Sequence, residues 1–347
     1  AKGGGWIFDG ATVNQAGNIT LEGVGFTNGS LTAGRDFSID NGARSLTLNR
    51  TSVSAGGNIT LAAAGGISQV GSDSANHLTM TAGGNISANA SAGTVVFRNA
   101  DLTSTSGNID VYGNGVTGVE LANVTLCATA GNISVFGQGN SVGGAYDLRA
   151  GVKLSGNSTF NALNTNIHGK NVAQMTSYAP AGLYIGGIQN FLGGNASVLG
   201  ESANGLGIGW LYAPGVLIHT MNIKTANFTM EGRSEATGVP RYGTSGGIGF
   251  NNFYHPVKAV FNLANGANVT LIGNTSSSQE GFAKDTDATT NSLVNSYIFT
   301  GNGAVDIIGK SGSGTGVTLR GFDNSALNGS MNITGESVSG TGVKFDR

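Results

Sequence analysis

The sequence has little cysteine, proline or charge. It contains one cysteine and four prolines in 347 residues, and 10% of the residues are charged. A single cysteine, Cys127, excludes an intramolecular disulfide, and its apolar neighbours predict a small core residue. No block of five like charges occurs and the net charge is −2, which argues against a nucleic-acid-binding surface. No stretch approaches the roughly 18 apolar residues of a transmembrane helix.

Glycine, in contrast, is abundant, with 60 residues in the chain. The glycines show no Gly-X-Y period, which excludes a collagen triple helix. Disordered chains usually combine high charge with few apolar residues, whereas 39% of this chain is apolar. The composition therefore predicts an ordered protein.

One short motif recurs along the chain. In its clearest form, at 55–61, it is a glycine turn, an asparagine and an alternating strand (Ala-Gly-Gly-Asn-Ile-Thr-Leu). The turn residue recurs as Asn18, Asp36, Asn58, Asn85, Asn108 and Asn132. A recurrence of about 20–25 residues indicates a solenoid, and so short a unit has no room for a crossover helix. The sequence therefore predicts an all-β fold, a parallel β-helix (β-solenoid) of about 15 coils.

The alternation within each unit predicts which side chains point inward. Ile59 and Leu61 should face the core, whereas Thr60 should face solvent. Glycine and asparagine are expected at the corners, where they supply left-handed backbone conformations, and not within strands. A β-sandwich is the alternative fold, but a sandwich does not require the same corner tripeptide at nearly constant spacing.

The chain divides into three stretches of different regularity. Residues 1–137 and 257–347 are regular, whereas 138–256 holds all four prolines and many of the aromatic residues. Proline is unfavourable within a sheet, so coils with longer loops are expected in the middle stretch. The polar segment 273–292 predicts an exposed loop. We expect one continuous solenoid, and a chain ending in mid-repeat is expected to be a fragment of a larger protein.

The repeats resemble those of a known family. The Ala-Gly-Asn-Ile-Thr/Ser units, the Ser-Gly-Thr-Gly-Val runs at 313–317 and 339–343, and the scarcity of cysteine are similar to the exoproteins of bacterial two-partner secretion. The likeness is greatest to the filamentous-haemagglutinin and high-molecular-weight (HMW-like) adhesin group. The likeness covers nearly the whole chain, but it rests on the style of the repeats and not on a unique motif. The Asn-Pro-Asn motifs of the family's secretion domain are absent.

The resemblance implies a right-handed β-helix that is secreted, stays at the bacterial cell surface, and attaches to host cells. It implies three partners: host cell-surface glycans or glycoproteins, the outer-membrane secretion pore of the two-partner pathway, and a cytoplasmic N-glycosyltransferase. No cofactor is expected. The stalk of a contact-dependent toxin is an alternative within the same family.

Motifs of catalysis and metal binding lack their usual context. Residues 139–143 and 243–247 match G-x-S-x-G without the strand-turn-helix that a nucleophile requires. The histidines (His77, His168, His219 and His255) are scattered, and Asp285 and Asp287 are expected to be solvated, so no metal site is predicted. A carbohydrate-active β-helix enzyme, a polysaccharide lyase or hydrolase, is the alternative to a non-catalytic adhesin. It would need a cluster of carboxylates that the sequence does not reveal.

Aromatic residues in the middle stretch are the candidates for recognition. Aromatic faces stack on sugars or anchor protein partners, and arginines nearby supply hydrogen-bond donors. The candidate binding residues are Trp210, Tyr212, Arg241, Tyr242, Phe253 and Tyr254. Burial of these rings beneath long loops is the alternative, and it is slightly favoured for Trp210.

Asparagine also occurs often in the sequon Asn-x-Ser/Thr, the acceptor of N-linked sugars. Many of these matches are expected to serve turns in a chain so rich in asparagine, threonine and serine. The resemblance implies glycosylation, for which the candidates are Asn18, Asn58, Asn85, Asn132, Asn268, Asn274 and Asn332. Modified residues should lie at exposed corners such as Asn58 or Asn274.

Overall fold

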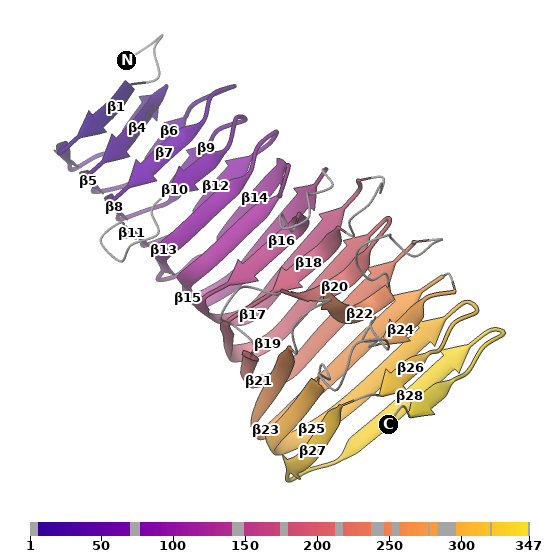
Figure 1. Ribbon diagram of the computed structural model, residues 1–347. Coiled ribbons are helices and arrows are strands. Elements are labelled where there is room, and N and C mark those ends of the chain that lie inside the picture. The colour runs from indigo at the N-terminus through magenta and orange to yellow at the C-terminus, as the bar shows by residue number, and fades with distance from the viewer. Residues whose placement is uncertain are drawn as a thin grey trace.

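Each turn of the chain adds short strands to three parallel stacks, which together form a rod with the two termini at opposite ends (Figure 1). The computed structural model describes residues 6–69, 77–140, 149–173, 180–211, 218–236, 246–251, 257–276, 278–282, 296–319 and 321–345. In these ranges the strands pair in parallel with the preceding and following coils, and no helix occurs. The predicted parallel β-helix is confirmed.

We name the three stacks the first, second and third face, in chain order. The first face contains β1 (Trp6–Asp9), β4 (Val24–Thr27), β7 (Leu46–Asn49), β10 (Ile67–Gln69), β16 (Ala150–Ser155), β18 (Ala181–Ile185), β20 (Leu206–Leu211), β22 (Gly246–Asn251), β24 (Glu280–Phe282), β26 (Val317–Leu319) and β29 (Val343–Phe345). The second face contains β2 (Thr12–Gln15), β5 (Ser30–Ala33), β8 (Ser52–Ala55), β11 (Leu78–Ala82) and β27 (Phe322–Leu327). The third face contains β3 (Ile19–Glu22), β6 (Phe37–Asp40), β9 (Ile59–Ala62), β12 (Ile86–Ala90), β14 (Ile109–Gly115) and β28 (Met331–Ser337).

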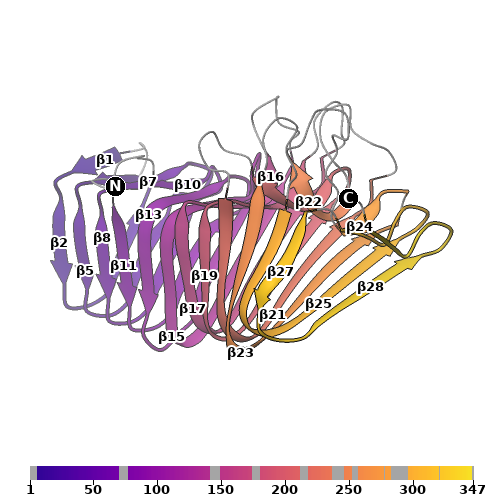
Figure 2. The same cartoon turned by 60° about the horizontal axis from the view of Figure 1, so that its bottom comes forward.

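The remaining strands bend around corners and belong to more than one face. They are β13 (Val95–Ser104), β15 (Val119–Gly139), β17 (Asn157–Asn171), β19 (Ile188–Ser202), β21 (Ile218–Ser234), β23 (Lys258–Thr275) and β25 (Ser296–Ser311). β13 joins the first and second faces, β15 runs through all three, and the others join the second and third. Figure 2 shows the coils side by side from β2 to β28.

The coils widen along the rod. Equivalent corner residues are 23 positions apart at Asn85 and Asn108 but 41 apart at Asn227 and Asn268. Within the described ranges the third face therefore has twelve strand segments, from β3 to β28, where uniform spacing predicted about 15 coils. Between Asn227 and Asn268, many of the additional residues lie between the strands, at 235–245 and 252–257, and the longer strands account for the rest.

A continuous apolar core runs along the inside of the rod. Ile59, Ile86 and Ile109 lie in register in consecutive coils and are fully buried, whereas Thr60 is exposed. The predicted facing of these strands is confirmed. Cys127 is a correction: Leu126 and Ala128 point inward, so Cys127 lies half-buried on the outside, 3.8 Å from the Asn161 amide nitrogen.

The recurring asparagine forms a ladder at the corner between the second and third faces. In the early coils its side-chain oxygen accepts the backbone N–H of the equivalent residue one coil on, as Asn58 Oδ1 does from Asn85 N (2.8 Å). In the later coils the side chains bond directly, as Asn227 Nδ2 does to Asn195 Oδ1 (2.8 Å). The ladder comprises Asn18, Asp36, Asn58, Asn85, Asn108, Asn132, Asn164, Asn195, Asn227 and Asn268.

Asparagines with a left-handed backbone occur at a different corner, between the first and second faces. Asn28, Asn99 and Asn123 have φ between 53° and 57° there, and Gly156 takes the same place with φ 65°. The ladder residues are not among those with positive φ in the described chain. The corner asparagine of the repeat is therefore selected for its side-chain hydrogen bonds and not for a left-handed conformation.

Paired glycines close the corner between the third and first faces. A Cβ on Gly169 would collide with the Gly182 carbonyl oxygen, and a Cβ on Gly232 with that of Gly247. The same contact recurs in the pairs Gly113–Gly118, Gly137–Gly151, Gly200–Gly207, Gly273–Gly281, Gly309–Gly316 and Gly335–Gly342. Most of these glycines lie inside strands, so the expectation that glycine stands only at breaks is wrong. Two strands approach too closely there for any side chain.

Candidate functional site

Five of the six predicted binding residues, namely Tyr212, Arg241, Tyr242, Phe253 and Tyr254, lie outside the described residues. The sixth, Trp210, is described.

The outer side of the first face is covered in the middle of the rod. Every residue of β18 is buried, although Leu183 and Ile185 alone belong to the main core. Tyr184 points the other way and forms a separate apolar cluster with Ala150, Ala181 and Leu206. On the third face, by contrast, outward residues such as His168 and Leu199 are half-buried. Over these coils the outward side chains of the first face are therefore more deeply buried than those of the third face.

Trp210 is a correction to the predicted binding set. Its side chain is fully buried in the main core, and its ring lies edge-on to Phe261 with the centroids 5.6 Å apart. It is stacked on His219, whose Nδ1 accepts the Gly187 N–H. A ring enclosed in this way cannot stack on an external ligand, so the core interpretation holds for Trp210.

Buried aromatic rings fill the same stretch of the interior. Phe160 stacks on Phe191, and Phe261 on Phe299, with centroids 5.2 and 5.0 Å apart. Tyr297 is also enclosed, and burial raises the pKa of its hydroxyl above the ordinary value. The wider coils therefore have room for rings where the early coils hold isoleucine and leucine.

A charged cluster lies on the outside of the third face. His168 Nε2 is 3.1 Å from Glu201 Oε2, and Arg233 Nη1 donates to Glu201 Oε1 at 3.2 Å. Arg233 Nε also donates to Glu231 Oε1 (2.6 Å), and this hydrogen bond raises the pKa of the guanidinium. The sequence did not reveal this cluster, because its members are brought together by register from three coils.

An aromatic column adjoins that cluster. Tyr112 and Phe136 stack with an interplanar angle of 13°, and His168 meets Phe136 edge-on. The faces of these rings are turned toward the neighbouring coils, so mainly their edges point to solvent. Face-on stacking of a sugar is thus restricted on this column.

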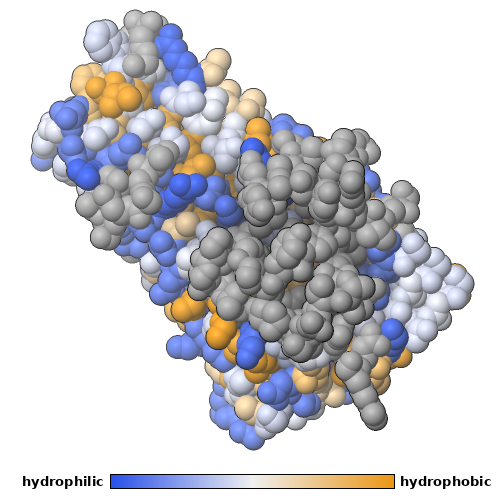
Figure 3. Space-filling view, viewed as in Figure 1, coloured by the Kyte–Doolittle hydropathy of each residue, from blue (hydrophilic) through white to orange (hydrophobic). Residues whose placement is uncertain are grey.

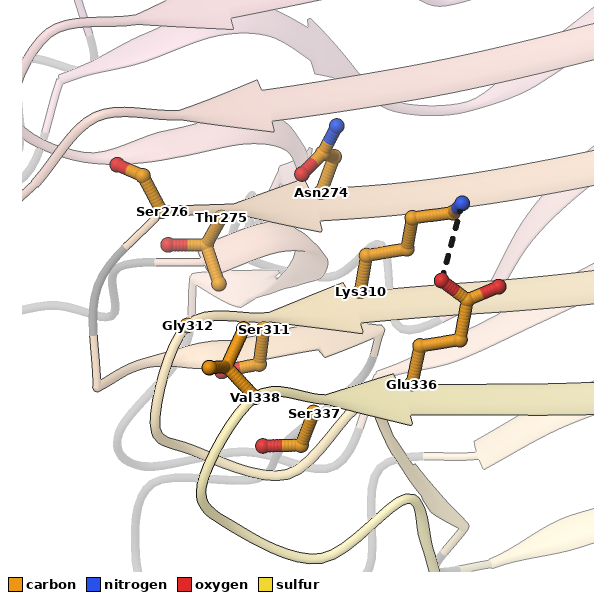
Figure 4. A pocket seen from close by; sticks show the side chains of 9 residues that line it. All are labelled: Asn274, Thr275, Ser276, Lys310, Ser311, Gly312, Glu336, Ser337 and Val338. Atoms are coloured by element: carbon orange, nitrogen blue, oxygen red, sulfur yellow. Dashed lines mark ion pairs between the residues drawn. The ribbon is translucent and has the colours of Figure 1, made fainter.

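The third candidate is a recess at the corner between the third and first faces, near the C-terminal end (Figure 4). It has a volume of about 450 Å³ and is lined by residues from the ends of β23, β25 and β28. Asn274, Lys310 and Glu336 occupy the same register position in three consecutive coils. Lys310 Nζ lies 3.1 Å from Glu336 Oε2.

Asn274 was expected in an exposed loop, and the structure corrects this. It lies within β23, pairs with Arg233 and Lys310 in the sheet, and is half-buried. The strand continues to Thr275 because the coils on either side supply backbone partners up to that residue. Asp285 and Asp287 lie outside the described residues.

The sequons follow from the geometry of the ladder. After each ladder residue the next side chain points inward and the one after it outward, so seven of the nine ladder asparagines are followed by an apolar residue and then Thr or Ser. Asn18, Asn58, Asn85 and Asn268 are exposed at the corner. Asn58, Asn132 and Asn268 also donate their side-chain amide to the preceding rung, and Asn332 donates to Asp306.

The described surface shows no feature of a membrane span or a metal centre. Among the described residues, no helix is long and apolar enough to cross a membrane. In the same ranges no group of three or more His, Cys, Asp or Glu side chains could hold a metal ion. On the side drawn in Figure 3, hydrophilic and apolar residues are interspersed over the part that is described.

Comparison of the chain with protein-family models, with curated proteins and with solved structures finds no match.

Proposed function

We propose that the chain is the rod of a secreted bacterial adhesin, a non-catalytic scaffold that attaches to glycans or glycoproteins on host cells. The observation that carries the proposal is the long parallel β-helix, a repeating rod with a hydrogen-bonded asparagine corner, whose repeats resemble those of the adhesin family. The coils widen along this rod, and the candidate aromatic and arginine residues fall within the wider coils.

The partners proposed with this function come from the resemblance of the repeats. They are an outer-membrane secretion pore of the two-partner pathway and a cytoplasmic N-glycosyltransferase. A parallel β-helix suits export through a pore, because each coil can fold on the one before it as the chain emerges. A toxin stalk would share this architecture.

The test is attachment of the purified chain to cultured host cells before and after enzymatic removal of cell-surface glycans. The proposal expects saturable binding that falls severalfold after glycan removal, because the loop residues would lose their ligand. Saturable binding that survives complete deglycosylation would point to a protein receptor. Absence of saturable binding would contradict the adhesin proposal.

A second candidate, a carbohydrate-active enzyme, is favoured by the charged cluster. Glu201 and Glu231 are two carboxylates on one sheet face beside Arg233 and His168, the residue types that glycan cleavage uses. Release of reducing ends from host or bacterial polysaccharides, lost on Glu201→Gln, would favour this candidate. Because Arg233 and His168 already occupy the Glu201 oxygens, we place it second.

A further inference from the structure

Two hydroxyl groups in the recess formed by β23, β25 and β28 already make hydrogen bonds within the fold. Ser311 Oγ donates to the Gln279 carbonyl (2.6 Å) and accepts from Gly314 N–H (2.8 Å). Ser337 Oγ likewise donates to the Gly314 carbonyl and accepts from Gly340 N–H. Both hydroxyls are therefore committed to the turns that follow their strands.

Four other polar side chains in the recess can take a ligand. Asn274 and Ser276 make no side-chain hydrogen bond to the described residues. Lys310 and Glu336 contact each other, but an ammonium has three donors and a carboxylate two oxygens, so each keeps capacity for a further partner. Figure 4 shows Asn274, Lys310 and Glu336 on three neighbouring strands, with the Lys310 ammonium beside the Glu336 carboxylate.

The charge of the recess selects the ligand class. Lys310 and Glu336 form a pair of zero net charge, with about half of each side chain exposed. An anionic ligand at Lys310 would be repelled by the adjacent Glu336 carboxylate, whereas a neutral hydroxyl can donate to the carboxylate and accept from the ammonium together. Val338, 89% exposed at the rim, adds an apolar contact of the kind that the C–H face of a sugar ring uses.

We infer that this recess binds a neutral sugar, a hexopyranoside whose neighbouring hydroxyls bridge Glu336, Lys310 and Asn274. The volume of about 450 Å³ lies within the range of about 300–1,000 Å³ typical of small-molecule sites. The lining residues of the recess include no aromatic ring, so affinity per site is expected in the millimolar range. The inference does not rest on the adhesin proposal. The recess lies outside residues 170–256, the part of the middle stretch that holds the candidate binding residues, and its sugar binding can be measured without cells.

The experiment is saturation-transfer NMR and titration of the full chain with methyl mannoside, methyl galactoside and the acidic methyl glucuronide. At least one neutral glycoside should bind with a millimolar dissociation constant and the glucuronide more weakly. Glu336→Gln should weaken neutral binding about tenfold or more, because a charge-assisted hydrogen bond is lost. The control is Glu120→Gln, which removes a carboxylate paired with Arg98 on the first face. This substitution should leave the affinity for the neutral glycosides unchanged.

Three results would overturn the inference: no saturation transfer to either neutral glycoside, tighter binding of the glucuronide than of both neutral sugars, or unchanged affinity in Glu336→Gln. Asn274→Ala offers an independent check, since it should also weaken binding without touching the ion pair. Circular dichroism of each variant confirms that the coils remain folded. Failure of this experiment leaves cell attachment through residues 170–256 to be decided by its own assay.

Discussion

The asparagine ladder makes a prediction about stability that can be worked out bond by bond. Asn195 Nδ2 donates to Asn164 Oδ1 (3.2 Å), and Asn195 Oδ1 accepts from Asn227 Nδ2 (2.8 Å). A neutral hydrogen bond contributes a net of about 0.5–1.5 kcal/mol, and exposure at the corner places these two toward the lower end. Asn195→Ala should therefore cost about 1–2 kcal/mol, which for a chain of this length lowers the melting temperature by roughly 1.5–3 °C.

The assay is differential scanning calorimetry of Asn195→Ala beside a matched control. Asn302 is exposed at the same corner three coils on but stands outside the ladder, so Asn302→Ala should leave the melting temperature nearly unchanged. Asn195→Asp adds a directional test. Its carboxylate still accepts from Asn227 but cannot donate to Asn164, so it should destabilise less than alanine, by about the net value of one hydrogen bond. Equal melting temperatures for Asn195→Ala and Asn302→Ala would refute the ladder as a stabilising element.

Three further predictions concern the core, the pH dependence and the sequons. Ile59→Ala should cost about 2–5 kcal/mol while the outward Thr60→Ala costs little, and equal melting temperatures would contradict the facing. Burial raises the pKa of Asp110 above its ordinary 3.8, so its charged form is penalised in the folded state; Asp110→Asn should raise the melting temperature at pH 7 and lose that gain below pH 3.8. Chain from the native producer should exceed 34.8 kDa by multiples of hexose, with peptide mapping placing sugar on Asn18 or Asn85 ahead of Asn268, whose amide nitrogen is bound; a bare mass would contradict this.

The regular part of the fold could be predicted because its signal is local. Alternation within a strand is a property of neighbouring residues, so Ile59 and Ile109 could be placed inward without knowledge of the coils around them. The corner asparagine could likewise be located by its spacing. Its function could not, because the ladder bond joins Asn195 to Asn227, and that contact requires the register between coils.

The features that the sequence did not reveal all depend on register over long separations. Gly169 and Gly182 oppose each other only once two faces meet at a corner, so the glycines within strands looked like turn residues. Most of the wide coils lack the Gly-Asn pair that marks the early coils, so their wider spacing could not be recognised. Extending the early spacing along the whole chain therefore overestimated the number of coils. The recess combines positions 274, 310 and 336, and no short motif connects residues so far apart. The burial of Trp210 could not be predicted for a different reason: composition alone does not separate a buried ring from an exposed one.

The proposal that attachment depends on the middle stretch, which holds the candidate binding residues, is tested by one comparison of cell binding. The test variant replaces five candidate residues by alanine, namely Tyr212, Arg241, Tyr242, Phe253 and Tyr254. The control variant replaces outward residues of the regular third face, Thr20, Thr60 and Ser87, which offer little binding chemistry. Melting curves of both variants establish that the rod is intact.

The measurement is the dissociation constant of each variant for the surface of host cells, alongside the unaltered chain. Loss of aromatic and arginine anchors typically costs more than 1 kcal/mol for each important residue, so the test variant should bind at least about tenfold more weakly at an unchanged melting temperature. The control variant should bind like the unaltered chain. Full binding by the test variant together with weakened binding by the control would contradict the account and make the regular face of the rod the adhesive surface.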